Sequence, residues 1–412
     1  MKKKLVLLLN EYPYNPGEYS FIRTELAALM KKYNVNIIAF SPSDIQKMPL
    51  DPKIELYHCK RKFGLKEKIE ACLKFVFSII GVQEIAEIFR SKGNIIGKIY
   101  DSISFFSCAQ QLRRFARKNH IIDKREEAIV YSYWFNANCL AFLINKKDNP
   151  NMKVISRIHG YDLYNERNAF QRQPFRTYMD RKIDKLFFVG DKGKEYYLNH
   201  WGVNKESNKY IVAPIGTRND NSYIKNDVLR HSFFRIVSCS NVIPLKRVDL
   251  IIKSLSELSD MEIEWVHFGT GELLDHMQAM AKQLLGEKNN VRYAFKGFVP
   301  VEEIMEYYES NYIDCFITTS STEGCPVSIQ EAMSYGIPII ATAVGEIPNM
   351  IQGNGELLSA NPTIEEIMGS IYKLADSGQE TILKMRGQSR KLWEEKYNAR
   401  INANKFMENI EA

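Results

Sequence analysis

Two glutamates in the second half of the chain have a spacing that could place both in one binding pocket. Glu323 falls in a polar loop after an apolar run, and Glu331 lies eight positions later, in a segment that Pro326 starts as a first-turn helical proline. A helix start offers unpaired N–H groups and a positive dipole end, which suit a phosphate or another anion. Either glutamate alone is better explained as a helix cap or a solvated residue, but Gly324 and Gly345 nearby favour a ligand pocket.

Cations and glycines after two earlier apolar runs point to the same kind of ligand. Lys246 and Arg247 stand together where a helix is expected to begin, a place where cations oppose the helix dipole and a bound anion would offset them. The two cations could equally lie exposed on a surface loop. Gly269 and Gly271 form a weak phosphate-loop signal, because Leu274 occupies the third glycine position of a dinucleotide fingerprint.

The first half of the chain contributes a glycine turn and a histidine. Gly17 and Glu18 follow the first apolar run through a proline-containing turn, and Gly17 by itself indicates no more than a turn. His159 comes directly after another apolar run, and a single histidine in that place is more often structural than catalytic. Asp162 lies three positions later, where it could orient the histidine or cap a helix.

In combination, these motifs closely resemble the retaining glycosyltransferases of family 4, which have the two-domain GT-B fold. Glu323 and Glu331 match the two glutamates, eight positions apart, of the family's signature motif. The segment 240–249 stands in the place of the family's G-R-L-x-x-x-K-G sequence, and it departs from that pattern because Asn241 replaces the usual arginine and Arg247 the glycine. The glycine turn before residue 20 looks like that of the exopolysaccharide branch, so the resemblance covers essentially the whole chain.

The resemblance implies a role for each of these residues. Lys246 would contact the donor diphosphate, Glu323 the hydroxyls of the donor sugar, and His159 the region of the transferred sugar and the acceptor, so these three are the expected catalytic residues. Glu331 would hold the ribose hydroxyls. The others are implied on the acceptor side, Glu18 and Asp162, and on the donor side, Gly17, Asn241, Arg247, Gly269, Gly271, Gly324, Gly345, Glu346 and Ile347.

The implied reaction moves a sugar from a UDP- or GDP-sugar to a saccharide acceptor with retention at the anomeric carbon. Departure of the nucleoside diphosphate builds negative charge on its phosphate oxygens, which fixed positive groups stabilise. No Asp-x-Asp sequence occurs in the chain, and lysine and arginine can supply the neutralising charge. We therefore expect no cofactor and activity without an added metal.

Apolar runs that alternate with segments of helical period are typical of βαβ units and predict an α/β protein with parallel sheets, of which the second half forms a doubly wound domain. The resemblance implies two such Rossmann-like domains that face each other across a cleft. We expect an acceptor-binding domain over residues 1–216, a nucleotide-sugar-binding domain over 217–391, and a helix over 392–412 that returns to the first domain, with 217–231 as the linker. The expected strands are residues 4–9, 35–40, 128–131, 153–158, 185–189 and 210–212, then 234–239, 262–268, 291–295, 315–319, 338–343 and 355–358.

The charge is concentrated in one part of the first domain. Residues 60–125 hold 15 Lys or Arg and 6 Asp or Glu, a local balance of +9 within a net charge of +7. Apolar residues recur there at helical spacing, so the segment could dock on an anionic membrane surface, where each cation contributes about 1 kcal/mol. It could equally form ordinary amphipathic helices with solvated lysines. No nucleic-acid-binding motif accompanies the charge.

The composition is that of a soluble globular protein, with 45% hydrophobic and 25% charged residues, and no run of 18 apolar residues would span a membrane. Seven scattered cysteines without a C-x-x-C pair fit a reducing cytoplasm, and the basic segment 60–125 fits a lipid-linked saccharide acceptor at the inner face of the cell membrane. A nucleotide-sugar epimerase and an inactive sugar-binding or scaffold subunit remain alternatives on the same fold. A dehydrogenase is disfavoured by Leu274.

Overall fold

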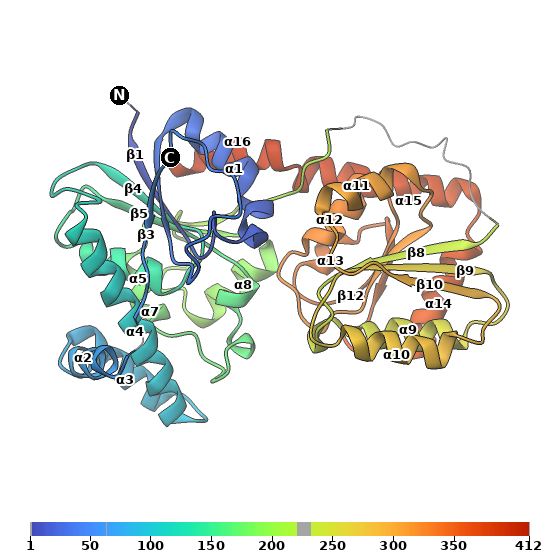
Figure 1. Cartoon of the computed structure of the whole chain (residues 1–412), viewed down its shortest axis with the longest axis horizontal. Coiled ribbons are helices and arrows are strands. Elements are labelled where there is room, and N and C mark those ends of the chain that lie inside the picture. Colours follow the sequence, from blue (N-terminus) through green and yellow to red (C-terminus); the bar gives the residue numbers. More distant parts are fainter. Residues whose placement is uncertain (1, 63, 221–231, 412) are drawn as a thin grey trace. The chain divides into compact units, whose positions relative to one another are not determined.

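All thirteen strands of the described residues run parallel, in two separate sheets. The computed structural model describes residues 2–62, 64–220 and 232–411. The chain divides into unit 1, which comprises Met1–Pro214 and Ala403–Ala412, and unit 2, Ile215–Asn402 (Figure 1). This division falls two residues before the predicted domain boundary, and residues 221–231 of the predicted linker lie outside the described part of the chain.

Unit 1 contains a seven-stranded sheet in the order β3-β2-β1-β4-β5-β6-β7. Its strands are β1 (Lys4–Leu9), β2 (Asn34–Ala39), β3 (Glu55–His58), β4 (Ala128–Ser132), β5 (Lys153–Ile158), β6 (Lys185–Phe188) and β7 (Tyr210–Val212). Six of them were predicted to within one residue at each end. The exception, β3, was not predicted, because its residues are half-buried or exposed and form no apolar run.

Helices cover both faces of this sheet. Successive strand residues point to opposite faces, so Val130 and Phe188 join the core under α4 and α5, whereas Tyr131 and Phe187 contact Phe406 of α16. No helix of the described residues has both the length and the hydropathy of a membrane-spanning segment. The helices of unit 1 are α1 (Tyr19–Lys32), α2 (Leu65–Val76), α3 (Ile79–Arg90), α4 (Ile95–Lys118), α5 (Ala137–Asn145), α6 (Gly160–Leu163), α7 (Arg176–Lys182) and α8 (Asp191–His200).

Unit 2 contains a six-stranded sheet in the order β10-β9-β8-β11-β12-β13, and each strand was predicted to within one residue at each end. The strands are β8 (Phe234–Cys239), β9 (Ile263–Phe268), β10 (Val291–Phe295), β11 (Cys315–Thr318), β12 (Ile339–Thr342) and β13 (Gly355–Leu358). The helices are α9 (Val248–Glu257), α10 (Leu274–Leu285), α11 (Val301–Ser310), α12 (Val327–Ser334), α13 (Ile347–Met350), α14 (Ile364–Ala375) and α15 (Gln379–Leu392). Two Rossmann-like parallel-sheet folds are thereby confirmed.

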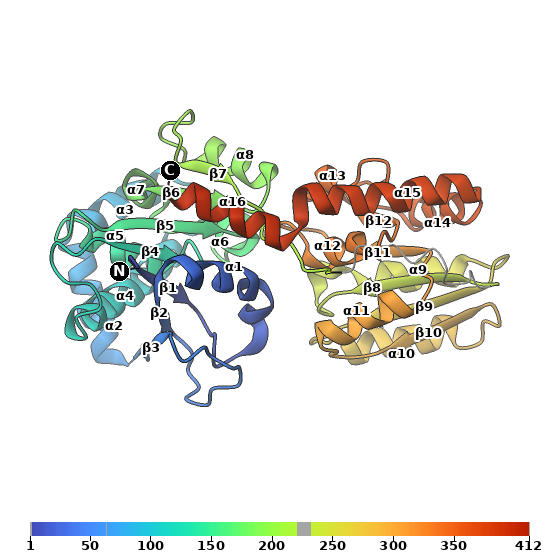
Figure 2. The same cartoon turned by 90° about the horizontal axis from the view of Figure 1, so that it is seen from above.

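Residues 403–411 of the last helix, α16 (Ala399–Glu411), lie against the sheet of unit 1 (Figure 2). The Phe406 ring lies 5.1 Å from Tyr131 and 4.7 Å from Phe187, centroid to centroid. Lys153 and Lys185 donate from Nζ to carbonyl oxygens near the end of α16, at 2.7 and 2.6 Å. Cations at a helix C-terminus satisfy its unpaired carbonyls and offset its dipole, so these two lysines fix the end of α16.

In both sheets, the strand order reverses beside the first strand of the unit. The reversal lies between β1 and β4 in unit 1 and between β8 and β11 in unit 2. Loops that leave neighbouring strands on opposite sides of such a point diverge, and ligands of doubly wound sheets bind in the crevice between them. The loops after these four strands are therefore where a site is expected.

Candidate functional site

In unit 2, an ion pair joins the loops that leave β8 and β11. Lys246 ends a short 3-10 turn after β8, and its Nζ contacts Oε1 of Glu323, which lies in the loop between β11 and α12. The two side chains are 23% and 10% exposed, so the pair is partly shielded from water. Two of the three residues predicted to be catalytic are thus in contact at the reversal point of the sheet.

Arg247, the next residue, holds three loops together. Its Nε donates to the Thr319 carbonyl at 2.6 Å, and its Nη2 donates to the carbonyls of Ser320 at 3.0 Å and Ala360 at 2.8 Å. A further bond runs from Nη1 to Oδ1 of Asn361 at 3.0 Å. Four of the five guanidinium N–H donors are therefore used inside unit 2. This side chain, for which a bound anion was one interpretation of the sequence, is thus largely occupied by the protein itself.

The backbone at Arg247 explains why the resemblance places a glycine there. Arg247 has φ 46°, in the left-handed region that glycine adopts without strain. The arginine keeps this conformation because its guanidinium binds the loops after β11 and β13. Arg247 thus occupies a backbone conformation that suits glycine, and its side chain is held by four hydrogen bonds.

The loop after β12 packs directly against the Glu323 loop. Gly345 has φ 54°, and a Cβ atom there would lie 2.0 Å from the carbonyl oxygen of Glu323, so only glycine fits. The N–H of Glu346 donates to the Gly324 carbonyl at 2.9 Å, and the N–H of Ile347 donates to the Val344 carbonyl at 3.1 Å. The N–H groups of both predicted donor-side residues are therefore engaged within the protein, and that of Glu346 ties this loop to the residue after Glu323.

Gly269 and Gly271 play a similar packing role beside the β8 loop. A Cβ atom would lie 1.9 Å from the Ser240 carbonyl oxygen at Gly269 and 2.5 Å from that of Val242 at Gly271. The Gly-Thr-Gly segment thus lets the loops after β8 and β9 approach backbone to backbone. Asn241 lies between these contacts and is exposed.

The charges of Glu331 and Lys246 both influence Cys239 at the end of β8. Burial and the Glu331 carboxylate raise the pKa of Cys239 to about 12, and the Lys246 ammonium opposes them. Cys239 is the last residue of β8, so both charges lie close to the carboxyl end of this strand. Lys246, Glu323 and Glu331 consequently share one region of unit 2, and no group of three metal-ligating side chains was found in the part of the chain that the structure describes.

In unit 1, Glu18 organises the loop that follows β1. Its buried carboxylate accepts backbone N–H bonds from Asn10 at 2.9 Å, Glu11 at 2.7 Å and Tyr12 at 3.0 Å. It also accepts a bond from Nε1 of Trp134 at 2.5 Å, which ties the β1 loop to the loop after β4. The residue predicted on the acceptor side therefore shapes the two loops at the reversal point.

Gly17, beside Glu18, is exposed, and the protein's own packing does not require a glycine there. Its N–H donates to Oδ1 of Asn15 at 3.0 Å, and an added Cβ atom would make only an ordinary 3.6 Å contact with that oxygen. Its φ is outside the left-handed region that glycine favours.

His159 lies at the start of α6, with its ring against two aromatic side chains. Its ring centroid is 4.5 Å from that of Trp134 and 5.0 Å from that of Tyr133. Both ring nitrogens are buried and have no hydrogen-bond partner among the described residues. Burial, reinforced by the Arg157 cation, lowers the pKa of His159 to about 3, so the imidazole is neutral at pH 7.

Asp162 caps α6, and both oxygens of its carboxylate accept backbone N–H groups. Oδ1 accepts the backbone N–H of His159 at 2.6 Å, and Oδ2 accepts that of Phe135 at 2.5 Å. Burial raises the pKa of Asp162 to about 6, although the nearby Arg176 cation and these N–H bonds favour the charged form. Of the two roles left open by the sequence, the structure shows the cap.

Replacing His159 with glutamine should reduce the protein's sensitivity to acid. The native pKa of about 3 lies below the ordinary 6.5, so between these values the unfolded chain binds a proton that the native state does not. The stability linked to this residue is complete above pH 6.5 and falls as the pH drops toward 3. Glutamine binds no proton in either state, so the variant should lose less unfolding free energy between pH 6.5 and about 4.

Urea unfolding of both proteins at a series of pH values measures this difference. Asp162, whose raised pKa gives the opposite trend from about pH 6 downward, is present in both proteins and cancels in the comparison. Equal losses in wild type and His159→Gln would contradict a low native pKa of His159.

Sequence reasoning missed the residues after β4. Trp134 contacts both Glu18 and His159, and Nδ2 atoms of Asn136 and Asn138 donate to Oδ1 of Asn10 at 3.4 and 3.3 Å. The signal was present in the run 132–138, in which aromatic and asparagine residues directly follow a buried strand. These residues complete the reversal point of the first sheet.

Comparisons with known proteins match part of the chain by sequence and the whole chain by fold. Residues 221–392 match the family described as Glycosyl transferases group 1. An uncharacterized glycosyltransferase of Haemophilus influenzae is 28% identical over 188 residues, which cover 44% of this chain and 50% of the relative. The amylovoran biosynthesis glycosyltransferase AmsK of Erwinia amylovora is 24% identical over 213 residues, covering 49% and 51%. The chain spans about half the length of the curated relatives it matches.

Solved structures resemble the whole chain. The lipopolysaccharide outer core galactosyltransferase WaaB, in its apo form, has a TM-score of 0.67 at 16% identity, with 99% of each chain covered. HepE of Anabaena, in complex with UDP, has a TM-score of 0.68 at 14% identity, again over 99% of each chain. At these identities the likeness concerns the fold. The chain therefore has the GT-B fold of two Rossmann-like domains, and residues 221–392 match the glycosyl transferases group 1 family.

Proposed function

We propose that this protein is a retaining glycosyltransferase that transfers a sugar from a UDP- or GDP-sugar to a saccharide acceptor in bacterial surface polysaccharide synthesis. The observation that carries the proposal is the Lys246–Glu323 ion pair at the reversal point of the group 1 domain. A partly shielded cation beside two carboxylates can bind a diphosphate and the hydroxyls of a nucleotide-sugar together. The polysaccharide relatives and the neighbour solved with UDP support this choice of substrates.

Donor binding would exchange one partner of the ion pair for another. A diphosphate oxygen takes the place of the Glu323 carboxylate at Nζ of Lys246, which leaves Glu323 to accept hydrogen bonds from sugar hydroxyls. Glu331, at the same strand end, accepts those of the ribose. Since the loops are held by Arg247 and Gly345, the charges are in place before the reaction, which is the main requirement for electrostatic stabilisation of a leaving group.

In the transfer step, the bond between the anomeric carbon and the diphosphate oxygen breaks, and its electron pair leaves with the diphosphate. The acceptor oxygen bonds to the same face of the carbon, and its proton passes to the departing phosphate oxygen, which becomes basic as the bond breaks. His159 is neutral, and its ring nitrogens are buried and unpartnered among the described residues, so it would bind a sugar hydroxyl once the side chains that cover these nitrogens move aside. Trp134 beside it offers an aromatic surface to the sugar ring.

A panel of UDP-, GDP- and ADP-sugars tests the proposal. A donor that binds only the folded state raises the unfolding midpoint, which a thermal-shift assay detects. The bound donor is then incubated with candidate saccharides, and NMR of the product gives the anomeric configuration. Release of nucleoside diphosphate with an inverted product would overturn retention. Conversion of the nucleotide-sugar without an acceptor would identify an epimerase, and binding without any turnover a sugar-binding subunit.

Activity should persist after removal of divalent metal ions. Lys246 supplies a positive charge at the place where a diphosphate would bind, so the leaving group does not depend on a metal ion for neutralisation. We expect the rate with excess EDTA to stay within about twofold of the untreated rate, well below the tenfold that corresponds to about 1.4 kcal/mol. A complete loss that magnesium or manganese restores would contradict this expectation.

A further inference from the structure

Exposed apolar side chains gather on one part of unit 1. Of the eighteen large apolar side chains that are exposed among the described residues, ten lie within residues 65–100, which are less than a tenth of the chain. Single exposed apolar residues are normal on a protein surface, but contiguous groups mark interaction sites. The ten are Leu65, Ile69, Leu73, Val76, Phe77, Ile79, Val82, Phe89, Ile96 and Tyr100.

Helix α2 has two apolar faces. Ala71 and Phe75 are buried on the face toward the core, where the Phe75 ring packs edge-on against the ring of Phe106 in α4. Leu65, Ile69 and Leu73 follow one another at four-residue intervals, so they share a second face, and all three are exposed. One apolar stripe is enough to attach a surface helix to its domain, so the second stripe has another use.

Helix α3 repeats this arrangement. Glu84 and Ile88 are buried on its inner face, where Glu84 accepts hydrogen bonds from Ser102 Oγ at 2.9 Å and from the N–H of Phe175 at 3.1 Å. Ile79 and Val82 lie three residues apart on an outer face and are exposed, and Phe89 continues the stripe. The buried Glu84 anchors α3 to the domain, while its apolar outer stripe faces away from the core.

The charges around these stripes are positive. Within residues 62–100, excluding residue 63, which the structure does not describe, no carboxylate side chain belongs to an exposed residue. Glu70 binds Lys74 and Arg114, and Glu84 and Glu87 both bind Arg172. Six cationic residues in the same segment are exposed: Lys62, Lys66, Lys68, Lys74, Arg90 and Lys92.

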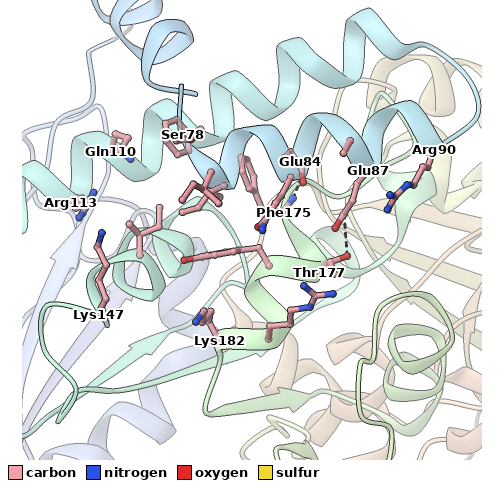
Figure 3. Close-up of a pocket in the computed structure, with 18 residues that line it drawn as sticks. Ser78, Glu84, Glu87, Arg90, Gln110, Arg113, Lys147, Phe175, Thr177 and Lys182 are labelled. Carbon is pink, nitrogen blue, oxygen red and sulfur yellow. Dashed lines mark hydrogen bonds between the residues drawn. The ribbon is translucent and has the colours of Figure 1, made fainter. Parts of the chain in front are cut away.

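A cavity of about 790 Å³ lies behind α3 (Figure 3). Its interior includes the buried rings of Phe106 and Phe175. Its two carboxylates are engaged by the protein, since Glu84 binds Arg172, and Glu87 binds Arg172 and accepts a 3.1 Å bond from Thr177. None of the predicted site residues lines this cavity. Cations from four segments of the chain do: Arg90, Arg113, Lys147, Arg181 and Lys182.

We propose that α2 and α3 dock on the surface of an anionic phospholipid bilayer, with their outer apolar stripes among the lipid chains and the phosphate of one lipid headgroup in the cavity behind α3. Apolar stripes flanked by cations match the boundary between acyl chains and anionic headgroups. A second copy of this chain is a poorer partner, because it would bring six exposed cations against six like charges. The proposal goes beyond the proposed function, since docking on a bilayer requires no sugar transfer.

Vesicle sedimentation with the full chain tests the docking. Vesicles of phosphatidylcholine and phosphatidylglycerol should bind the protein at least about tenfold more tightly than phosphatidylcholine alone at low salt, and high salt should reduce this preference. The double variant Phe77→Ser with Ile79→Ser should lower binding about tenfold. Phe77 is 84% exposed and Ile79 is 79% exposed, and in the proposal both side chains enter the lipid. Phe298→Ser, at a residue 74% exposed in unit 2, is the matched control and should bind like wild type.

The headgroup site has its own variant. Arg181→Glu with Lys182→Glu reverses two exposed charges of the cavity and should lower the preference for anionic vesicles about tenfold without changing binding to neutral ones. Lys384→Glu, at a lysine 75% exposed in unit 2, is the control. Equal binding of wild type to neutral and anionic vesicles would overturn the proposal. So would a dimer in analytical ultracentrifugation that Phe77→Ser with Ile79→Ser dissociates, which would make this surface an interface between copies.

Discussion

Substitution of Lys246 by methionine should lower kcat/KM for the nucleotide-sugar by about 10²–10³-fold, equivalent to about 2.7–4 kcal/mol of transition-state stabilisation. Lys246 carries the cation that contacts Glu323 at the reversal point of the second sheet. In the proposed reaction, this cation meets negative charge that grows as the diphosphate leaves. An interaction that strengthens in the transition state acts on kcat, so most of the loss should appear in kcat and less in KM.

A lysine of the same unit provides the control for this experiment. Lys253 pairs with Asp249 on α9 at 2.8 Å, is 44% exposed, and lies outside the loops of the site. Lys253→Met should leave kcat/KM within about twofold of wild type, because an exposed pair within one helix contributes little. Lys246→Arg, which retains the charge, should recover part of the activity. If Lys246→Met turned over the donor like Lys253→Met, the assignment of the site would be wrong.

The second large effect is expected on stability. Arg157 on β5 and Glu25 on α1 form a 2.6 Å ion pair whose side chains are only 1% and 5% exposed. Burial lowers the pKa of Arg157, but the Glu25 carboxylate together with Tyr131 and Tyr133 outweighs it and leaves the pKa raised, so the guanidinium stays charged. Glu25→Ala would leave this cation buried without its carboxylate. We expect the free energy of unfolding of unit 1 to fall by about 3–5 kcal/mol.

Hydrogen exchange by mass spectrometry measures this loss for each unit separately, because protected amides report the opening of their own region. Peptides of unit 1 should exchange faster in Glu25→Ala, while those of unit 2 keep their rates. Lys192→Ala, which removes an exposed 3.0 Å pair with Glu195 in the same unit, is the matched control. The double variant Glu25→Leu with Arg157→Met should recover much of the lost stability, and no recovery would mean that packing, not charge, is responsible.

The strands were readable from the sequence because parallel strands are buried on both faces. Such strands appear as continuous apolar runs, and residues 5–9 are an example, since all five are buried. In contrast, β3 lies at the edge of the sheet and contains Glu55, Tyr57 and His58, which give no apolar run. Twelve of the thirteen described strands could therefore be located, and the one that was not, β3, contains no buried residue.

The side-chain partners in the candidate site could not be predicted in the same way. Glu18 binds Trp134, 116 positions away, and Arg247 binds Ala360, 113 positions away. Such contacts depend on the order of strands in the sheet, and the sequence does not show which loops that order brings together. The sequence therefore indicated which loops carry chemistry. It did not indicate that the side chains of Glu18 and Arg247 would form hydrogen bonds that connect these loops to one another.

The discontinuous composition of unit 1 has a consequence for biosynthesis. Phe406 covers the Arg157 guanidinium, with 4.5 Å between the cation and the ring centroid, and it belongs to the segment 403–412 that completes this unit. A ribosome makes every strand of unit 1, and then the whole of unit 2, before it reaches this phenylalanine. Domains generally fold as they emerge from the ribosome. Unit 2 is therefore complete before unit 1, whose sheet lacks the cover of residues 403–412 until translation ends.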